Sequence, residues 1–453
     1  AAQPEAQPLS HDALAEHFVQ AYGEDWRYIA QWGKWFEWKA DRWLEDATER
    51  PVGLAKQVTR EALTWPEAAQ ITSSDKRKVN SIMTAKALLS FARADRAIAA
   101  TVDQWDVEPW LLGVPGGVLE LQSGKMLEPD RGQYITKQCA VAPSAGRPEK
   151  WLAFLQRVTD DNEPLISFLH RCAGYWLTGS AREHSLTFLY GTGANGKSVF
   201  MRTMGGILGV DALQYAASCQ MAVFTESKVE RHSTELARLR GARLVIAEET
   251  AGGAKWDQAK IQWLTGEGSV TARFMRQDDF TFKPAFKLLF AGNHKPMLRS
   301  VDEAIKRRFH LVPFTVTIPV GERDLELYEK LREEWPQILG WMLDGCMEWQ
   351  RAGLAAPDVV RDATNTYLET EDALGQWLEE CCERVGQEEG ATLYRSYVSW
   401  CETNGERCWS RRTWSNTLVE RNFLLRKDGR GARCFAGLKL KATAAPAPRY
   451  PAD

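Results

Sequence analysis

The sequence predicts a mixed α/β protein with several domains, and three observations carry that prediction. The chain has 453 residues, which is more than one small hydrophobic core can organise. Residues 185–208 contain an apolar strand pattern, a glycine-rich loop and an apolar helix pattern in direct succession. Residues 391–442 combine helical patterns with a basic hairpin pattern. With 44% hydrophobic and 26% charged residues, the composition is that of a globular protein.

The chain shows no signal for a membrane or for secretion. No apolar run reaches the roughly 18–20 residues that a membrane span requires. The first residues, AAQPEAQP, lack the positive and apolar segments of a secretory signal. The nine cysteines are scattered without a C-x-x-C pair, so we expect reduced and mostly buried thiols. A cytoplasmic protein without a membrane partner is expected.

Residues 11–145 are rich in tryptophan and predict an α+β domain. Apolar residues alternate between Trp32 and Trp43 and predict a hairpin that turns at 39–41. Helices are expected over 54–63 and 79–98, and short strands joined by glycine turns over 110–124. Exposed tryptophans could stack on bases, but their alternation favours burial in the core.

The segment 185–208 carries a phosphate-binding pattern, G-x-x-x-x-G-K-S, between a buried strand and a helix. Its glycines let the backbone curl so that N–H groups and the helix dipole face a phosphate. The lysine supplies a charge to the outer phosphates, and the serine hydroxyl is a ligand for Mg²⁺. The sequence therefore predicts ATP and Mg²⁺ as cofactors, bound by Gly191, Thr192, Gly193, Ala194, Asn195, Gly196, Lys197 and Ser198.

A second predicted strand begins at Arg243, continues through the apolar residues 244–247 and ends in two carboxylates, Glu248 and Glu249. An acid at the end of a strand can hold Mg²⁺, and its neighbour can orient the attacking water. We assign Glu248 to the metal together with Ser198, and Glu249 to water activation. Two solvated acids at a strand exit are the alternative, which the spacing of about fifty residues from Lys197 disfavours.

A third apolar run, 286–292, ends at Asn293, whose amide can contact the outer phosphate and report the nucleotide state. After it, Arg307 and Arg308 end a predicted helix. An arginine that reaches the phosphate of a neighbouring subunit would stabilise the charge that develops during transfer, and we expect Arg308 in the first place to do so. An exposed basic helix end is the alternative; the other three elements favour the catalytic interpretation.

These four elements in this order resemble a superfamily 3 helicase of the AAA+ class. More narrowly, they resemble the primase-helicases of phages and plasmids of the satellite-phage type. The resemblance rests on segments 237–247, 271–276, 286–296 and 307–314, and less specifically on 33–38 and 110–125 upstream. It implies a ring, commonly a homo-hexamer, that translocates on single-stranded DNA and unwinds forked DNA inside a bacterial host cell.

The resemblance also leaves two questions open. Its members often carry a small polar residue where Glu248 stands, so the division of roles between Glu248 and Glu249 is open. We find no primase signature, which leaves a fragment of a longer primase-helicase or a separate primase protein as alternatives.

The resemblance further implies a hairpin over 270–283 that projects into the ring pore. Its predicted contacts with strand phosphates are Arg273, Arg276 and Lys283.

The segment from Tyr394 to Lys441 holds eleven Lys or Arg and four Asp or Glu, a net charge of +7. Two predicted helices and a hairpin turning at 428–429 follow a winged-helix pattern that fits DNA. A winged helix that docks a protein is the alternative. The predicted DNA contacts are Arg411, Arg412, Asn416, Arg426, Lys427 and Arg430.

The expected architecture is an AAA+ P-loop ATPase core with an N-terminal α+β pre-helicase domain and a C-terminal winged-helix module. The predicted divisions are a disordered lead (1–10), the pre-helicase domain (11–145), the helicase core (146–345), a helical connector (346–390), the winged-helix-like domain (391–442) and a disordered tail (443–453). The leading hypothesis is a replicative DNA helicase. The alternative is a DNA-binding initiator or loader that ATP regulates without unwinding, and only the resemblance disfavours RNA as the track.

Overall fold

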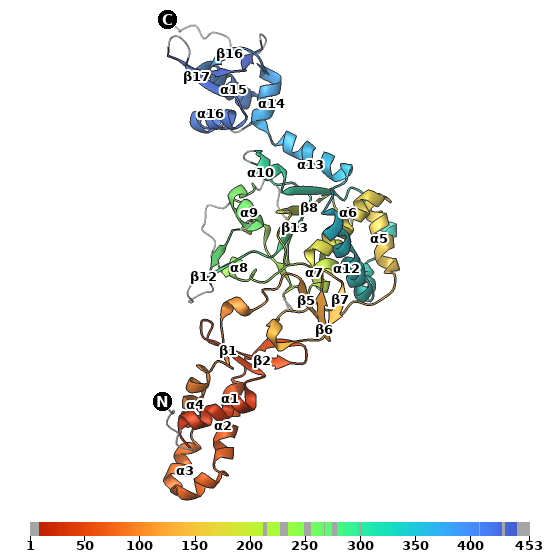
Figure 1. Ribbon diagram of the computed structural model, residues 1–453. Coiled ribbons are helices and arrows are strands. Elements are labelled where there is room, and N and C mark those ends of the chain that lie inside the picture. The colour runs from red at the N-terminus through yellow and green to blue at the C-terminus, as the bar shows by residue number, and fades with distance from the viewer. Residues whose placement is uncertain are drawn as a thin grey trace.

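The computed structural model describes residues 9–211, 215–226, 234–248, 255–266, 268–273, 279–298, 301–406, 408–427 and 431–441. A helical N-terminal region lies at one end of the molecule, a sheet flanked by helices lies in the middle, and a small C-terminal module lies at the other end (Figure 1). The predicted mixed α/β class is confirmed. Within the described residues, no helix is both long and apolar enough to cross a bilayer.

The N-terminal region combines helices with a small sheet of order β3-β2-β1-β4. Its elements are α1 (His11–Tyr22), β1 (Trp26–Ile29), β2 (Lys34–Lys39), β3 (Arg42–Glu45), α2 (Arg50–Ala62), α3 (Ser73–Val79), α4 (Ile82–Ala92) and β4 (Ala99–Ala100). The predicted hairpin is confirmed as β2 and β3. The single helix predicted over 79–98 is wrong, because Asn80 and Ser81 separate two helices and the second ends at Ala92.

The tryptophans of this region mostly form a core. Trp26, Trp35, Trp43 and Trp105 are all less than a tenth exposed. Trp43 and Trp105 pack edge to face with ring centroids 5.8 Å apart. The interpretation as core residues is confirmed for these four.

A three-stranded meander, β5 (Leu111–Val114), β6 (Gly117–Glu120) and β7 (Lys125–Leu127), follows. Its side chains Leu112, Val114 and Leu119 join the hydrophobic core of the central domain, not that of the N-terminal helices. This part of the predicted 11–145 domain therefore packs with the sequence that follows it.

The central sheet has five parallel strands in the order β14-β8-β13-β10-β9. The strands are β8 (Leu186–Tyr190), β9 (Ala216–Ser218), β10 (Leu244–Glu248), β13 (Lys287–Gly292) and β14 (Phe309–Pro313). The helices around it are α5 (Glu149–Thr159), α6 (Glu163–Trp176), α7 (Lys197–Ile207), α8 (Thr234–Ala237), α9 (Gln258–Thr265), α10 (Glu303–Lys306), α11 (Leu327–Arg332), α12 (Trp335–Ala352) and α13 (Asp358–Thr370).

Both faces of this sheet are buried, which explains why its strands are continuous apolar runs in the sequence. On one face Leu189 and Leu289 pack in a core shared with α6, α7 and α12. On the other face Phe188 and Phe290 pack in a core shared with α9 and α10. Because the strands are parallel, the residues that end β8, β10, β13 and β14 meet at one edge.

The C-terminal module has its own core and follows α13. Its elements are α14 (Ala373–Cys381), β15 (Cys382–Glu383), β16 (Gln387–Glu389), α15 (Gly390–Asn404), α16 (Arg411–Glu420), β17 (Leu424–Lys427), β18 (Arg433–Ala436) and β19 (Lys439–Leu440). Trp377 of α14 lies in this core and its Nε1 donates to Ser396 Oγ at 3.2 Å. The module therefore includes a helix that the sequence-based division left in the connector.

Acid is expected to destabilise the central sheet through His310 on β14. Its ring lies 5.5 Å from that of Phe168, and burial lowers its pKa from 6.5 to about 4. The unfolded chain therefore binds this proton at a higher pH than the folded chain, so this contribution to stability is complete above about pH 6.5 and is lost as pH falls towards 4. Urea midpoints measured from about pH 7 to about pH 4.5 should fall more steeply for the native chain than for His310→Gln. Parallel curves for the two proteins would contradict this assignment.

Candidate active site

The glycine-rich loop 191–196 connects β8 to α7 at the carboxyl edge of the sheet. Gly196 has a φ of +83°, and a Cβ there would lie 2.6 Å from Val158 Cγ1. A Cβ on Gly191 would lie 1.9 Å from the Phe314 carbonyl oxygen. Both positions therefore require glycine, the first for its backbone conformation and for space, the second for space alone.

Two buried polar side chains hold this loop. Asn195 is 3% exposed, and its Nδ2 donates to the Phe314 carbonyl oxygen at 2.6 Å. Lys197 Nζ donates to Asn195 Oδ1 at 2.9 Å and to the Gly191 carbonyl oxygen at 2.7 Å. Burial lowers the pKa of Lys197, and the negative charge of Glu248 opposes that shift. The amine thus lies inside the loop, bound to neutral oxygens.

The neighbouring strands bring two more predicted residues to the same place. Glu248 ends β10, and its Oε2 lies 3.5 Å from Ser198 Oγ. Asn293 follows β13, and its Oδ1 lies 3.3 Å from Lys197 Nζ. Four residues predicted from three separate motifs therefore meet at one edge. Glu249 lies outside the described residues.

The oxygen atoms of this group suit a magnesium ion bound with a nucleotide. Mg²⁺ prefers oxygen ligands, keeps several waters and takes only one or two protein ligands beside phosphate. The Ser198 hydroxyl and the Glu248 carboxylate are both exposed and lie on adjacent elements. Ser198 and Glu248 would hold the ion, and the loop amides with Lys197 would hold the phosphates.

The structure separates the paired arginines. Arg308 is 6% exposed, its Nε donates to Thr265 Oγ1 at 3.1 Å, and its Nη1 donates to the Ala304 carbonyl oxygen at 2.6 Å. Arg307 is exposed. A guanidinium that is buried and bonded within its own chain has little reach toward another subunit. This geometry favours Arg307 over Arg308 for such a contact, whereas the sequence-based hypothesis placed the contact first on Arg308.

The predicted hairpin before Asn293 consists of β11 (Val270–Ala272) and β12 (Phe280–Phe282), paired antiparallel. Arg273 and Lys283 flank these strands and are exposed. Arg273 Nε lies 4.0 Å from Asp279 Oδ1, a long and exposed ion pair that contributes little. Arg276 lies outside the described residues.

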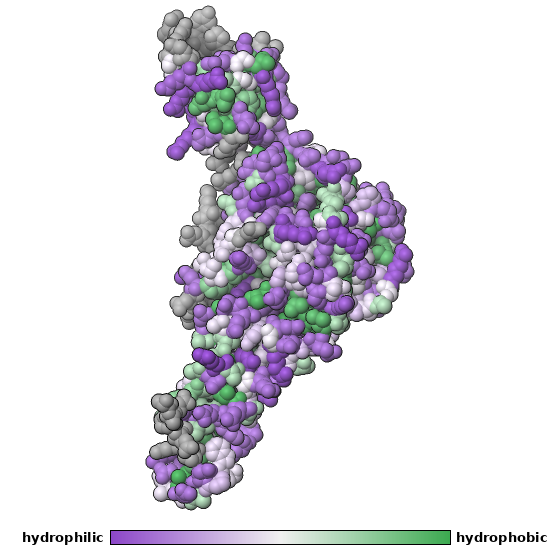
Figure 2. Space-filling view, viewed as in Figure 1, coloured by the Kyte–Doolittle hydropathy of each residue, from purple (hydrophilic) through white to green (hydrophobic). Residues whose placement is uncertain are grey.

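Most of the cations predicted to bind DNA in the C-terminal module are exposed. The described cations lie on α16 and β17 and are Arg411, Arg412, Arg426 and Lys427, whereas Arg430 lies outside the described residues. The predicted polar contact Asn416, on α16, is exposed as well. Apolar side chains also gather on the surface of this module (Figure 2), and its exposed large apolar residues include Val419, Leu424 and Leu425. This apolar surface keeps the protein-docking alternative open.

One set of contacts beside the site had no signal in the sequence. Lys295 Nζ lies over the rings of Tyr190, at 4.6 Å, and Tyr367, at 5.4 Å. Glu371 accepts a hydrogen bond from the Leu298 backbone N–H at 2.8 Å. These contacts connect the segment after Asn293 to the end of α13, which leads to the C-terminal module. No motif spacing indicates contacts between segments about seventy residues apart.

Comparison with known proteins identifies the chain's relatives. Residues 15–160 match the family model described as D5 N terminal like, and residues 189–308 match a family of unknown function, DUF5906. The chain is 23% identical over 452 residues to a "Putative helicase" of Acanthamoeba polyphaga mimivirus, a match that covers 88% of this chain and 46% of the relative. It is 25% identical over 211 residues to a "Putative primase" of African swine fever virus, covering 45% of this chain and 22% of the relative.

The chain is thus similar over residues 15–160 to the family described as D5 N terminal like, and at 23–25% identity to viral proteins named putative helicase and putative primase. The chain spans less than half the length of the curated relatives named above. The C-terminal region of NrS-1, in its apo structure, is similar in fold with a TM-score of 0.49 and 10% identity, covering 94% of this chain and 99% of that one. The named relatives come from viruses of eukaryotes, so a bacterial host stays a prediction.

Proposed function

We propose that this chain is an ATP-driven replicative DNA helicase with a P-loop core of the AAA+ superfamily 3 type. The observation that carries the proposal is the meeting of Lys197, Ser198, Glu248 and Asn293 at one edge of a parallel sheet. The names of the relatives, helicases and a primase of viruses, support a role in replication.

In the proposed mechanism the loop 191–196 holds the triphosphate through backbone N–H groups at the start of α7. Lys197 exchanges its bonds to Gly191 and Asn195 for bonds to phosphate oxygens, which stabilise the ammonium better than neutral oxygens do. Ser198 and Glu248 would hold Mg²⁺, which would neutralise charge on the phosphates. Glu249 orients the attacking water, and Asn293 contacts the outer phosphate.

The proposed track is single-stranded DNA in the pore of a homo-hexameric ring. The β11–β12 hairpin carries Arg273 and Lys283 as exposed cations, which suits contacts with phosphates without a choice of sequence. The C-terminal module follows the order helix, two short strands, helix, helix, hairpin, which supports a winged helix whose α16 and β17 contact DNA.

A strand-displacement assay on forked DNA tests the proposal against the loader alternative. The native chain should release the labelled strand only with Mg·ATP, and Lys197→Ala should release none. Hydrolysis of ATP that DNA stimulates, without strand release, would favour the loader. Competition between DNA and RNA oligonucleotides for stimulation of the ATPase distinguishes the two tracks.

Replacing Arg307 by alanine is expected to lower ATP turnover by about 1000-fold if its guanidinium completes the site of a neighbouring subunit. Mixing Arg307→Ala with Lys197→Ala subunits should restore part of the activity, because some interfaces then combine an intact loop with an intact arginine. Arg308→Ala is the matched control; it removes the bond to Thr265 and should lower stability without rescue on mixing. No recovery in the Arg307→Ala mixture would contradict a role in trans.

A further inference from the structure

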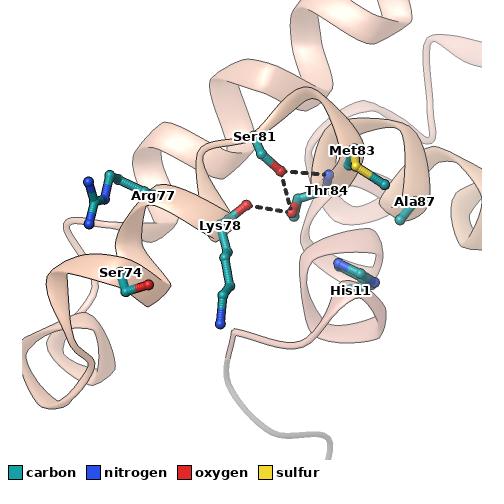
Figure 3. A pocket seen from close by; sticks show the side chains of 8 residues that line it. All are labelled: His11, Ser74, Arg77, Lys78, Ser81, Met83, Thr84 and Ala87. Atoms are coloured by element: carbon teal, nitrogen blue, oxygen red, sulfur yellow. Dashed lines mark hydrogen bonds between the residues drawn. The ribbon is translucent and has the colours of Figure 1, made fainter.

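A hollow of about 590 Å³ opens between the start of α1, helix α3 and the first turns of α4. It lies in the N-terminal region, at the opposite end of the molecule from the C-terminal module (Figure 1). No residue of this hollow belongs to the candidate active site or to the predicted DNA contacts. Figure 3 shows its lining side chains, which are His11, Ser74, Arg77, Lys78, Ser81, Met83, Thr84 and Ala87.

The wall of this hollow is preformed by hydrogen bonds. Ser81 begins α4, and its Oγ accepts from the Thr84 backbone N–H at 3.2 Å. Thr84 Oγ1 donates to the Lys78 carbonyl oxygen at 2.7 Å, so the end of α3 is fixed against the start of α4 (Figure 3). Behind it, Leu88 and Leu89 of α4 are buried in the core that α1 and α2 share. A ligand would therefore meet an ordered surface.

The rim of the hollow is basic. The last turn of α3 carries Lys76, Arg77 and Lys78, of which Arg77 and Lys78 line the hollow. The exposed Lys86 lies on α4 between the lining residues Met83 and Ala87. Lys78 pairs with Asp75 at 3.1 Å, but both side chains are largely solvated and the pair is weak. Among the described residues, no carboxylate lies within ion-pair distance of Arg77 or Lys86. The rim thus offers cations to an anionic partner.

An apolar stripe runs beside these cations. Met83, Ala87 and Phe91 are four residues apart on α4 and therefore share one side of the helix. Met83 is 79% exposed, Phe91 is 51% exposed and the adjacent Ile82 is 55% exposed. Such apolar side chains do not stabilise a bound phosphate group. A single strand presents unpaired bases as well as phosphates, and bases stack on aromatic rings. In a duplex the faces of the bases are covered by their neighbours.

We propose that this α3–α4 surface is a binding site for single-stranded DNA. Phosphates contact Arg77, Lys78 and Lys86, one base enters the hollow against Met83, and another stacks on Phe91. The inference rests on the proposed function, because it takes DNA as the partner of the chain. It adds a second contact for single-stranded DNA. This contact lies at the end of the molecule opposite the C-terminal module, with the central sheet between them.

Fluorescence anisotropy with the full chain tests the charged part of the site. The probes are an oligothymidine of about 20 nucleotides and a blunt duplex of the same length. Arg77→Ala/Lys86→Ala should weaken binding of the single strand about tenfold at low salt, and lower the slope of log Kd against log salt by roughly 1.4, which is two phosphate contacts. Lys56→Ala/Arg60→Ala, which removes two exposed cations from α2, is the matched control and should change neither value.

The apolar side chains of the site are tested by variants that should lower affinity without changing its dependence on salt. Met83→Ser/Phe91→Ser should weaken binding of the single strand while leaving the salt slope unchanged, because no charge is removed. Basal ATPase activity should stay the same in all of these variants. The inference would be overturned if the α3–α4 variants bound the single strand as tightly as Lys56→Ala/Arg60→Ala does. It would also be overturned if they lost as much affinity for the duplex as for the single strand. A loss of self-association without DNA, measured by sedimentation, would overturn it as well, because the surface would then contact another copy. A native chain that binds neither oligonucleotide would refute the proposed function itself.

Discussion

Replacing Lys197 by alanine is expected to lower the turnover number for ATP hydrolysis on the order of 100-fold or more. The amine is the only cation among the four residues that meet at the sheet edge, and it lies within hydrogen-bond distance of Gly191, Asn195 and Asn293. Removing it takes away the charge that would stabilise the phosphate oxygens as negative charge develops on them. Steady-state release of phosphate with saturating Mg·ATP measures the effect.

The matched control for this prediction is Arg202→Ala. Arg202 lies on the same helix, is exposed, and its guanidinium lies 4.0 Å from the Tyr328 ring centroid, away from the loop. It should keep most of the turnover. A comparison of melting temperatures separates lost chemistry from lost structure. If Lys197→Ala hydrolyses ATP as fast as Arg202→Ala, the loop is not the site of hydrolysis.

Replacing Arg243 by methionine is expected to cost about 3–5 kcal/mol of stability, because the change leaves buried polar groups without a donor. Arg243 is 4% exposed and precedes β10. Its guanidinium donates to the carbonyl oxygens of Leu177 and Leu111, and to that of Glu108 at 3.2 Å. It thus joins the central sheet to α6 and to the segment that begins the meander.

Urea denaturation followed by tryptophan fluorescence measures this loss, and the melting temperature should fall by roughly 10 °C. Arg238→Ala is the control, since Arg238 lies on the same segment but is exposed. The two variants should differ by at least about 2 kcal/mol. A smaller difference would mean that the carbonyl groups around Arg243 find other partners.

The sequence predicts the candidate site well because its parts are local. A strand, a loop and a helix follow one another without interruption around Lys197, and Glu248 and Asn293 each end an apolar run. Parallel pairing then brings the ends of these strands to one edge, which is a general property of such sheets. The finer assignment of roles to these residues stays a prediction.

The contacts that the sequence does not predict join segments far apart in the chain. The burial of Arg308 depends on Thr265, and the fixing of the loop depends on the Phe314 carbonyl oxygen that Asn195 binds. Helix α14 looked like part of a connector because its partners, such as Tyr397, come later in the sequence. Periodicity reports which residues are buried, but not against which other segment.

Binding of the triphosphate beside Lys197 is tested most directly with an acyl phosphate of ATP, which transfers its acyl group to a lysine close to the bound triphosphate and releases ATP. Mass spectrometry of the labelled chain then shows which lysine was modified. We expect acylation of Lys197 in the presence of Mg²⁺ and its suppression by an excess of unlabelled Mg·ATP. Absence of saturable labelling, or labelling confined to lysines away from residues 191–198, would contradict binding of the triphosphate beside Lys197.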